Sequence, residues 1–175
     1  MVRTWELWGK VVIAGTFALP LAALAIWLLS RFRARRGHPA PLRTALADVG
    51  IVAGTAPWVW MILTPRPGRE GVRLVPFADL AEVLAAHWET AFVQVGGNLL
   101  VFAALGALLP VRTARLASPA RIAAVAAAAS LLVEVLQYVL RLGRVSSVDD
   151  VLINVAGAVV AAMITRRWWA RTVSG

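Results

Sequence analysis

The chain has 175 residues, of which 60% are hydrophobic and 15% are charged, with a mean hydropathy of +0.75 and a formal net charge of +9. Soluble domains contain about 45–50% apolar and about 25% charged residues, so lipid is the expected solvent for much of this surface. The absence of cysteine excludes a disulfide framework, a thiol nucleophile and a cysteine metal site. The arginines lie in short clusters between apolar runs, as membrane topology signals do, so no nucleic-acid partner is expected despite the charge.

Five apolar runs are long enough to cross a bilayer as helices, which takes about 20 residues. The first, residues 11–29, is longer than the apolar core of a signal peptide and is followed by an arginine cluster, so we expect it to remain as a spanning helix. The others cover residues 45–63, 91–109, 122–140 and 148–165, approximately. None alternates as a strand does. The sequence therefore predicts a single domain, 1–175, that is an all-α bundle of about five transmembrane helices.

The loop from residue 64 to about 90 is the one long connection between these runs. Within it, Phe77, Leu80, Leu84 and Trp88 recur at helical spacing, and the acidic residues lie away from this stripe. A short helix lying on the membrane surface fits this pattern.

Lys and Arg are more numerous in the loops after the first, third and fifth runs than on the opposite side, with the densest cluster at 31–36. The more basic side is expected to be cytoplasmic. We therefore predict a multi-pass protein of the bacterial cell membrane with its N-terminus outside and its C-terminus inside. Asp48, near the inner end of the second run, is expected to be structural, satisfied by solvation or by a partner such as Arg43. Gly50 and Gly54 form a small-xxx-small motif that favours close helix packing.

Polar residues interrupt three of the apolar runs at a common depth. At about 1.5 Å of rise per residue, Asn98, Glu134 and Asn154 each lie roughly 9–10 Å below the same face of the membrane. Gln137 follows Glu134 on the same helical face. A charged side chain in mid-bilayer costs about 2.5–3.5 kcal/mol, so such groups should face the bundle interior and find partners.

A ring of charged residues is expected at the rim above this level. Arg141 and Arg144 follow the fourth run, and Asp149 and Asp150 begin the fifth, where carboxylates cap free N–H groups. We expect Glu134 to contact Arg141, Arg144 or the amide of Asn98 or Asn154. Asp149 and Asp150 could bind a divalent metal or act in acid–base chemistry, but we favour the interpretation that they cap their own helix and pair with Arg144.

Four stretches resemble the VanZ-like family of bacterial membrane proteins, named for a teicoplanin-resistance protein. They are RLVPF at 73–77, GNLLVFAALG at 97–106, Ser130 with Glu134 and Gln137, and RVSSVDDVLINVAG at 144–157. They cover about residues 50–165. Ser147 stands where the family often has Asp, which removes a carboxylate from any metal site. The resemblance implies an integral membrane protein linked to glycopeptide tolerance or to a cell-envelope property.

The candidate site is therefore a polar pocket in one leaflet, and catalytic residues remain unknown. It comprises Asn98, Glu134, Gln137, Arg144, Asp149, Asp150 and Asn154. These residues either bind a polar headgroup or ion, or form a hydrogen-bonded network that clamps three helices together. Metal binding by Asp149 and Asp150 would need more oxygen ligands than the sequence offers, so no metal or cofactor is expected.

Three function classes remain open from the sequence. The first is a binding or envelope-modifying factor whose partners are membrane lipids, a lipid-linked cell-wall precursor or a glycopeptide. The second is a membrane enzyme acting on a lipid-linked envelope substrate, although no recognisable catalytic motif is present. The third is a small proton-coupled transporter using Glu134, against which stands the placement of the polar residues in one leaflet only.

Overall fold

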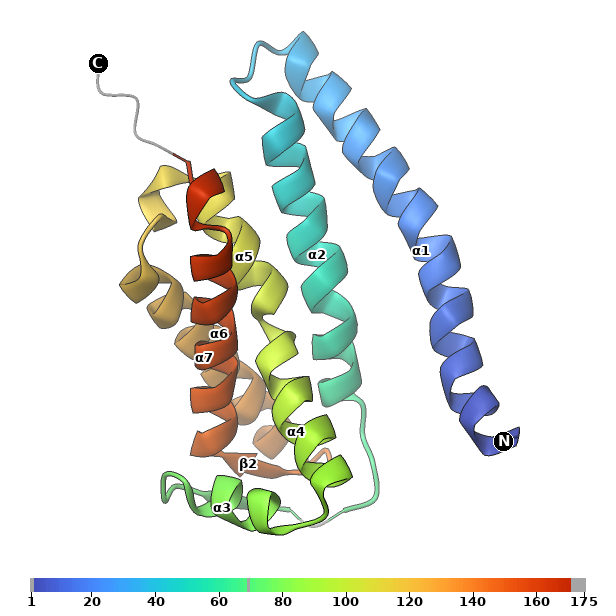
Figure 1. Cartoon of the computed structure of the whole chain (residues 1–175), viewed down its shortest axis with the longest axis vertical. Helices are drawn as coiled ribbons and strands as arrows, with labels where there is room; N and C mark the ends of the chain where they lie inside the picture. Colours follow the sequence, from blue (N-terminus) through green and yellow to red (C-terminus); the bar gives the residue numbers. More distant parts are fainter. Residues whose placement is uncertain (1, 69, 171–175) are drawn as a thin grey trace.

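The computed structural model describes residues 2–68 and 70–170, and the side chains from residue 16 onward (Figure 1). It is almost entirely helical, which confirms the predicted all-α class. The helices are α1 Val2–Arg35, α2 Pro41–Leu63, α3 Ala78–Ala85, α4 Trp88–Val101, α5 Ala103–Arg112, α6 Pro119–Val139 and α7 Val148–Ile164. Two short strands, β1 Gly71–Arg73 and β2 Val145–Ser147, and two 3₁₀ turns, Ala114–Leu116 and Arg166–Trp168, complete the described elements.

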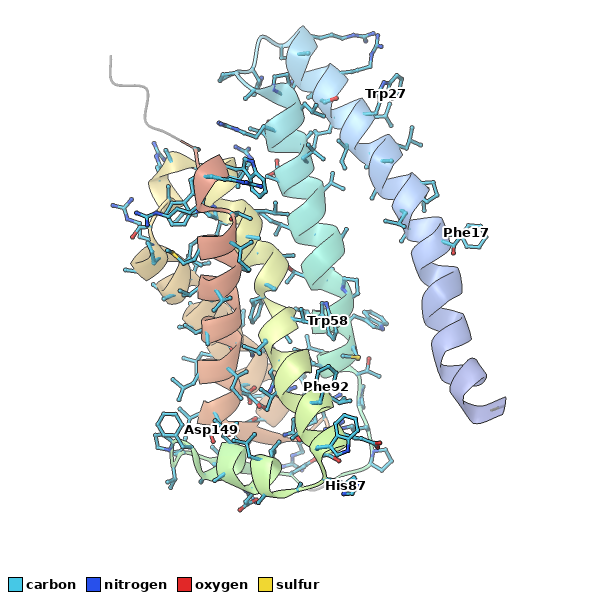
Figure 2. All side chains as sticks on the ribbon, in the orientation of Figure 1. Phe17, Trp27, Trp58, His87, Phe92 and Asp149 are labelled. Atoms are coloured by element: carbon cyan, nitrogen blue, oxygen red, sulfur yellow. The ribbon has the colours of Figure 1, made fainter. Side chains whose placement is uncertain are left out.

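Four helical segments of the described chain are long and apolar enough to cross a membrane: Thr16–Arg35, Pro41–Leu63, Trp88–Arg112 and Pro119–Val139. The fifth predicted span is α7, whose 17 residues make it about 25 Å long, at the lower limit for a crossing. The third span was predicted as one helix but is interrupted at Phe102, which separates α4 from α5. Large apolar side chains such as Phe17, Trp27 and Phe92 are more than half exposed on the outer surface (Figure 2), as lipid-facing residues would be.

The core of the bundle forms around α7, which packs against α4, α5 and α6. Two glycines allow this close approach: a Cβ on Gly157 would lie 2.0 Å from the carbonyl oxygen of Leu99, and one on Gly106 would lie 2.1 Å from that of Ala158. The predicted close packing at Gly50 and Gly54 is also present, with α5 as the neighbour of α2. In contrast, α1 lies at the side of the bundle and packs mainly on α2 (Figure 1).

The arginine-rich loops gather at one end of the bundle, where α1 meets α2 and α5 meets α6 (Figure 1). Asp48 is the acidic group at this end. Its carboxylate pairs with Arg33 of α1 and, at 2.7 Å, with Arg112 of α5. Asp48 thus has the structural role that was expected, but its partners are Arg33 and Arg112 rather than Arg43, because the ion pairs run between helices rather than along α2.

The opposite end of the bundle carries α3 and a small sheet that the sequence did not reveal. Strands β1 and β2 pair in parallel, with Gly71, Val72 and Arg73 opposite Val145, Ser146 and Ser147. The predicted short helix in the long loop is α3, and the apolar residues Phe77, Leu84 and Trp88 stay largely exposed. The sheet ties the long α2–α4 connection to the α6–α7 connection and so builds one wall of the site.

Candidate functional site

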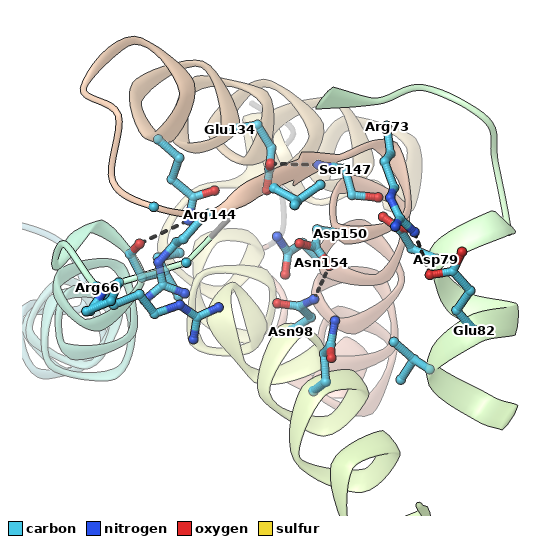
Figure 3. Close-up of a pocket in the computed structure, with 18 residues that line it drawn as sticks. Arg66, Arg73, Asp79, Glu82, Asn98, Glu134, Arg144, Ser147, Asp150 and Asn154 are labelled. Carbon is cyan, nitrogen blue, oxygen red and sulfur yellow. Dashed lines mark hydrogen bonds and ion pairs between the residues drawn. The ribbon is translucent and has the colours of Figure 1, made fainter. Parts of the chain in front are cut away.

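A cavity of about 520 Å³ opens between the sheet, α3 and the adjoining ends of α2, α4, α6 and α7 (Figure 3). It brings together six of the seven residues of the predicted pocket, from α4, α6, α7 and the loop before β2. They are Asn98, Glu134, Gln137, Arg144, Asp150 and Asn154. The common depth calculated from helical rise thus corresponds to a common cavity. That these residues bind a ligand stays a prediction.

Glu134 is 7% exposed and fastens β2 to α6. Its Oε2 accepts a hydrogen bond of 3.0 Å from the backbone N–H of Ser147, and its carbonyl oxygen accepts one of 3.0 Å from the hydroxyl of Ser146. Of its expected partners, Arg144, Asn98 and Asn154 line the same cavity as Glu134, but the hydrogen bond to its carboxylate comes from the backbone of Ser147 instead. A carboxylate at this depth instead satisfies a backbone donor of the strand.

Gln137 and Arg144 hold the C-terminal end of α2. The side-chain amide of Gln137 donates to the carbonyl oxygen of Ile62 at 3.0 Å, and Nη2 of Arg144 donates to that of Met61 at 3.0 Å. The last four carbonyls of a helix have no partner within the helix, and its negative end favours a cation. Both side chains therefore also serve the structure.

Asn98 and Asn154 make the remaining polar contacts between helices. Asn98 donates to the carboxylate of Asp150, and Asn154 donates through Nδ2 to the hydroxyl of Ser130 at 2.8 Å. Two buried polar atoms at this site have no hydrogen-bond partner: Oδ1 of Asn154 and Nε of Arg144. Buried polar atoms are normally paired, so both atoms retain capacity for a ligand or water.

Asp149 is the member of the predicted set that does not line the cavity. It is 2% exposed, and its two oxygens accept hydrogen bonds from the backbone N–H groups of Phe77, at 2.6 Å, and Leu80, at 3.0 Å. Asp149 therefore caps α3, and the prediction that it caps its own helix and pairs with Arg144 was wrong. The N-cap of α7 is Ser147, whose hydroxyl accepts from the backbone N–H of Asp149 at 3.2 Å.

Two further arginines line the cavity, Arg66 and Arg73. The guanidinium of Arg73 pairs with Asp79 and Glu82 of α3, and hydrogen bonds to these carboxylates raise its pKa above the usual value. Arg66 was not predicted, and its place depends on the fold of two loops. Its backbone N–H donates to the carbonyl oxygen of Leu142 at 3.1 Å.

Gly143 makes this approach of the two loops possible. Its φ is +67°, and a Cβ there would lie 1.9 Å from the carbonyl oxygen of Arg66. Glycine alone tolerates both conditions, because it has no Cβ and occupies the left-handed region freely. Arg66 and Arg144 are consequently neighbours at the mouth of the cavity (Figure 3).

The electrostatics of the site are mixed rather than uniformly negative. Within the described residues, no group of three or more His, Asp or Glu side chains is placed to hold a metal ion. Burial, and then the nearby charge of Arg66, lower the pKa of Arg144 from its usual value, while Asp150 and Glu134 oppose this shift. The cavity thus combines carboxylates that are already hydrogen-bonded with a pair of neighbouring cations.

The four stretches noted in the sequence converge on this region of the structure. RLVPF starts at the last residue of β1 and leads to α3, and GNLLVFAALG lies in α4 and α5. The third stretch lies in α6, and the fourth runs from Arg144 through β2 into α7. Comparison with curated proteins and with solved structures finds no match. A family model described as VanZ/LLP1 matches residues 51–170, more than half of the chain. The chain therefore belongs to the VanZ/LLP1 family.

Proposed function

We propose that this protein modulates tolerance to teicoplanin-class glycopeptide antibiotics, or a related property of the bacterial cell envelope, through the polar cavity. The observation that carries the proposal is the convergence of the four family stretches on one cavity of about 520 Å³. A cavity of this size lined by polar side chains gives the protein a place in which a polar headgroup or a part of an antibiotic can be held.

The proposed orientation places the cavity at the outer face of the cell membrane. The arginine-rich loops lie at the end of the bundle opposite the cavity (Figure 1), and such loops remain on the cytoplasmic side. The N-terminus is then outside and the C-terminus inside. An outward-facing cavity is accessible to membrane lipids, lipid-linked cell-wall precursors and glycopeptides without transport across the bilayer.

The test is expression of the chain and its variants in a glycopeptide-susceptible bacterium, with the minimal inhibitory concentration of teicoplanin as the readout. We expect the natural chain to raise this concentration and Glu134→Ala to abolish the increase, because β2 loses its anchor on α6. In Glu134→Gln an amide oxygen can still accept from the N–H of Ser147. Retained tolerance in this variant would exclude proton chemistry at Glu134.

Two controls make the result interpretable. Glu70→Gln removes a carboxylate from an exposed loop position outside the cavity and should leave tolerance unchanged. Membrane content of every variant is measured in parallel, so that loss of tolerance is separated from loss of protein. A natural chain that reaches the membrane and leaves teicoplanin susceptibility and other envelope phenotypes unchanged would contradict the proposal.

A membrane enzyme acting on a lipid-linked envelope substrate is the second candidate. Four carboxylates line the cavity, and Asp79 and Glu82 pair with Arg73. The observation in favour of an enzyme is that the other two, Glu134 and Asp150, are in none of the ion pairs of the described residues. General acid–base chemistry needs such a group within reach of the substrate. Asp150→Asn would abolish the activity of an enzyme that uses this base. In a binding protein it would leave tolerance largely intact, because an Asn side chain still accepts a hydrogen bond from Asn98.

A further inference from the structure

Arg66 and Arg144 form a pair of cations that lacks a neutralising ion pair. The ion pairs of the described residues involve Arg33, Arg73 and Arg112. Arg144 uses Nη2 on the carbonyl oxygen of Met61 and keeps a buried, unpartnered Nε. The contact of Gly143 with the backbone of Arg66 fixes the two loops to each other, so both arginines start from neighbouring positions of the backbone. An anion placed between them would relieve their repulsion and accept from the free donors.

A second cavity continues from this pair toward the apolar part of the bundle, along α2 and α4. It has a volume of about 560 Å³ and shares Arg66, Asn98, Arg144 and Asp150 with the polar cavity. The rest of its lining comes from α2 and α4: the apolar residues are Trp58, Met61, Ile62, Val93, Gly97 and Val101, and Glu89, Thr90 and Gln94 add polar groups. A cavity that combines the two arginines with apolar side chains of α2 and α4 can contact both the charged and the apolar part of a lipid molecule.

We propose that an anionic, phosphate-bearing membrane lipid with a hydroxylated headgroup occupies these joined cavities. Its phosphate lies between Arg66 and Arg144, and one of its chains lies between α2 and α4 against Trp58. A headgroup hydroxyl reaches into the polar cavity, where Oδ1 of Asn154 is a buried acceptor without a partner. This inference rests on the proposed function in that it assigns a ligand class to the same cavity.

The charge requirement is tested with the full chain in phosphatidylcholine nanodiscs. Phosphatidylglycerol with brominated acyl chains is added, and quenching of tryptophan fluorescence is compared with that by brominated phosphatidylcholine. The quenching that the natural chain shows and the Trp58→Phe variant lacks is the quenching that arises at the site. We expect the natural chain to prefer phosphatidylglycerol roughly tenfold, and Arg66→Gln and Arg144→Gln each to remove most of that preference.

Arg141→Gln is the matched control for these two variants. Arg141 lies in the same loop as Arg144 and is exposed, but it does not line either cavity. The same loss of charge there should leave the preference intact. Arg66→Gln keeps the test decisive if Arg144→Gln unfolds, because no hydrogen bond of the Arg66 side chain is lost. The proposal would be overturned if all three variants preferred phosphatidylglycerol over phosphatidylcholine to the same degree.

The chain requirement separates a lipid from a free phosphate compound. A Cβ on Gly97 would meet no atom within 4 Å, and Gly97 lines the crevice, so the side chain of Gly97→Leu can extend into it. Gly96 has equal space but does not line the crevice, which makes Gly96→Leu its control. We expect Gly97→Leu to lower the preference for phosphatidylglycerol several-fold and Gly96→Leu to leave it unchanged. Glycerol 3-phosphate should fail to displace the lipid at equal concentration, and displacement by it would overturn the lipid assignment.

Failure of this inference is distinguishable from failure of the proposed function. The fluorescence assay uses purified protein and does not depend on any effect on antibiotics. A lipid preference that Arg66→Gln removes supports the inference even if teicoplanin susceptibility is unaffected. Tolerance that depends on Glu134 without any lipid preference would overturn the inference and leave the proposed function in place.

Discussion

Backbone groups, rather than other side chains, are the main partners of the buried polar residues at this end of the bundle. Glu134 accepts from β2, Gln137 donates to the end of α2, and Asp149 accepts from the start of α3. Helix and strand ends leave N–H and C=O groups without partners, and near lipid there is little water to satisfy them. Among the buried atoms of the site, the capacity that remains for a ligand is then small and specific, and it lies at Arg144 and Asn154.

Asp149 provides the sharpest test at the residue scale. Phe77 has a φ of +65°, a costly conformation for an aromatic residue, and the Asp149 carboxylate holds its N–H. In Asp149→Ala two backbone N–H groups of α3 lose a charged acceptor, which we expect to reduce the free energy of unfolding by roughly 2–4 kcal/mol. Thermal unfolding in detergent measures the loss, and hydrogen exchange should increase in α3 first.

Glu70→Gln is the control for this variant, since Glu70 is exposed and has no such contacts. Its unfolding temperature should equal that of the natural chain. Unchanged protection of the α3 amides in Asp149→Ala would contradict the assignment of Asp149 as the cap of α3.

Helix packing at the scale of elements depends on small residues where two backbones meet. Gly157 of α7 and Gly106 of α5 allow α7 to approach α4 and α5 so closely that a methyl group would meet backbone atoms. Backbone atoms cannot move aside as the end of a flexible side chain can. The position of α7, and with it the depth of Asn154 and Asp150, therefore depends on these contacts.

Gly157→Ala is expected to destabilise the bundle by about 1–3 kcal/mol, because a Cβ there would lie 2.0–2.8 Å from backbone atoms of Leu99 and α7 must move away. Thermal unfolding in detergent is the measurement. Gly96→Ala, at a site with nothing within 4 Å of a Cβ, should be neutral or slightly stabilising. Equal unfolding temperatures for the two variants would show that α7 does not depend on this approach.

The sequence indicated where the helices lie and how deep the polar residues sit in the membrane. It did not indicate which groups these residues bond to. Run length predicted α2 and α6 closely, and helical rise placed Asn98, Glu134 and Asn154 at one level. Strands of three residues leave no periodic signal, and their pairing joins positions more than 70 residues apart. The hydrogen bond from the Phe77 N–H to Asp149 and the contact of the Arg66 loop with Leu142 also join residues that are far apart in the sequence. Local sequence patterns therefore could not indicate them.

The whole molecule is electrically asymmetric along the bundle axis. At one end, arginines dominate, and Asp48 links α1, α2 and α5 through Arg33 and Arg112. The other end carries α3, the sheet and the cavity, where carboxylates and arginines are mixed (Figure 1). A cell membrane retains basic loops on the cytoplasmic side, so this asymmetry gives the cavity its expected outward direction.

Single-cysteine variants can test this orientation without background, since the chain has no cysteine. Ala85 at the end of α3 and His38 between α1 and α2 are both exposed and lie at opposite ends of the bundle. A membrane-impermeant maleimide added to intact cells should label Ala85→Cys and should label His38→Cys only after the membrane is permeabilised. The inverse pattern would place the cavity on the cytoplasmic face. An antibiotic acting from outside could then not reach it directly, so the orientation experiment also decides how the cavity can influence glycopeptide tolerance.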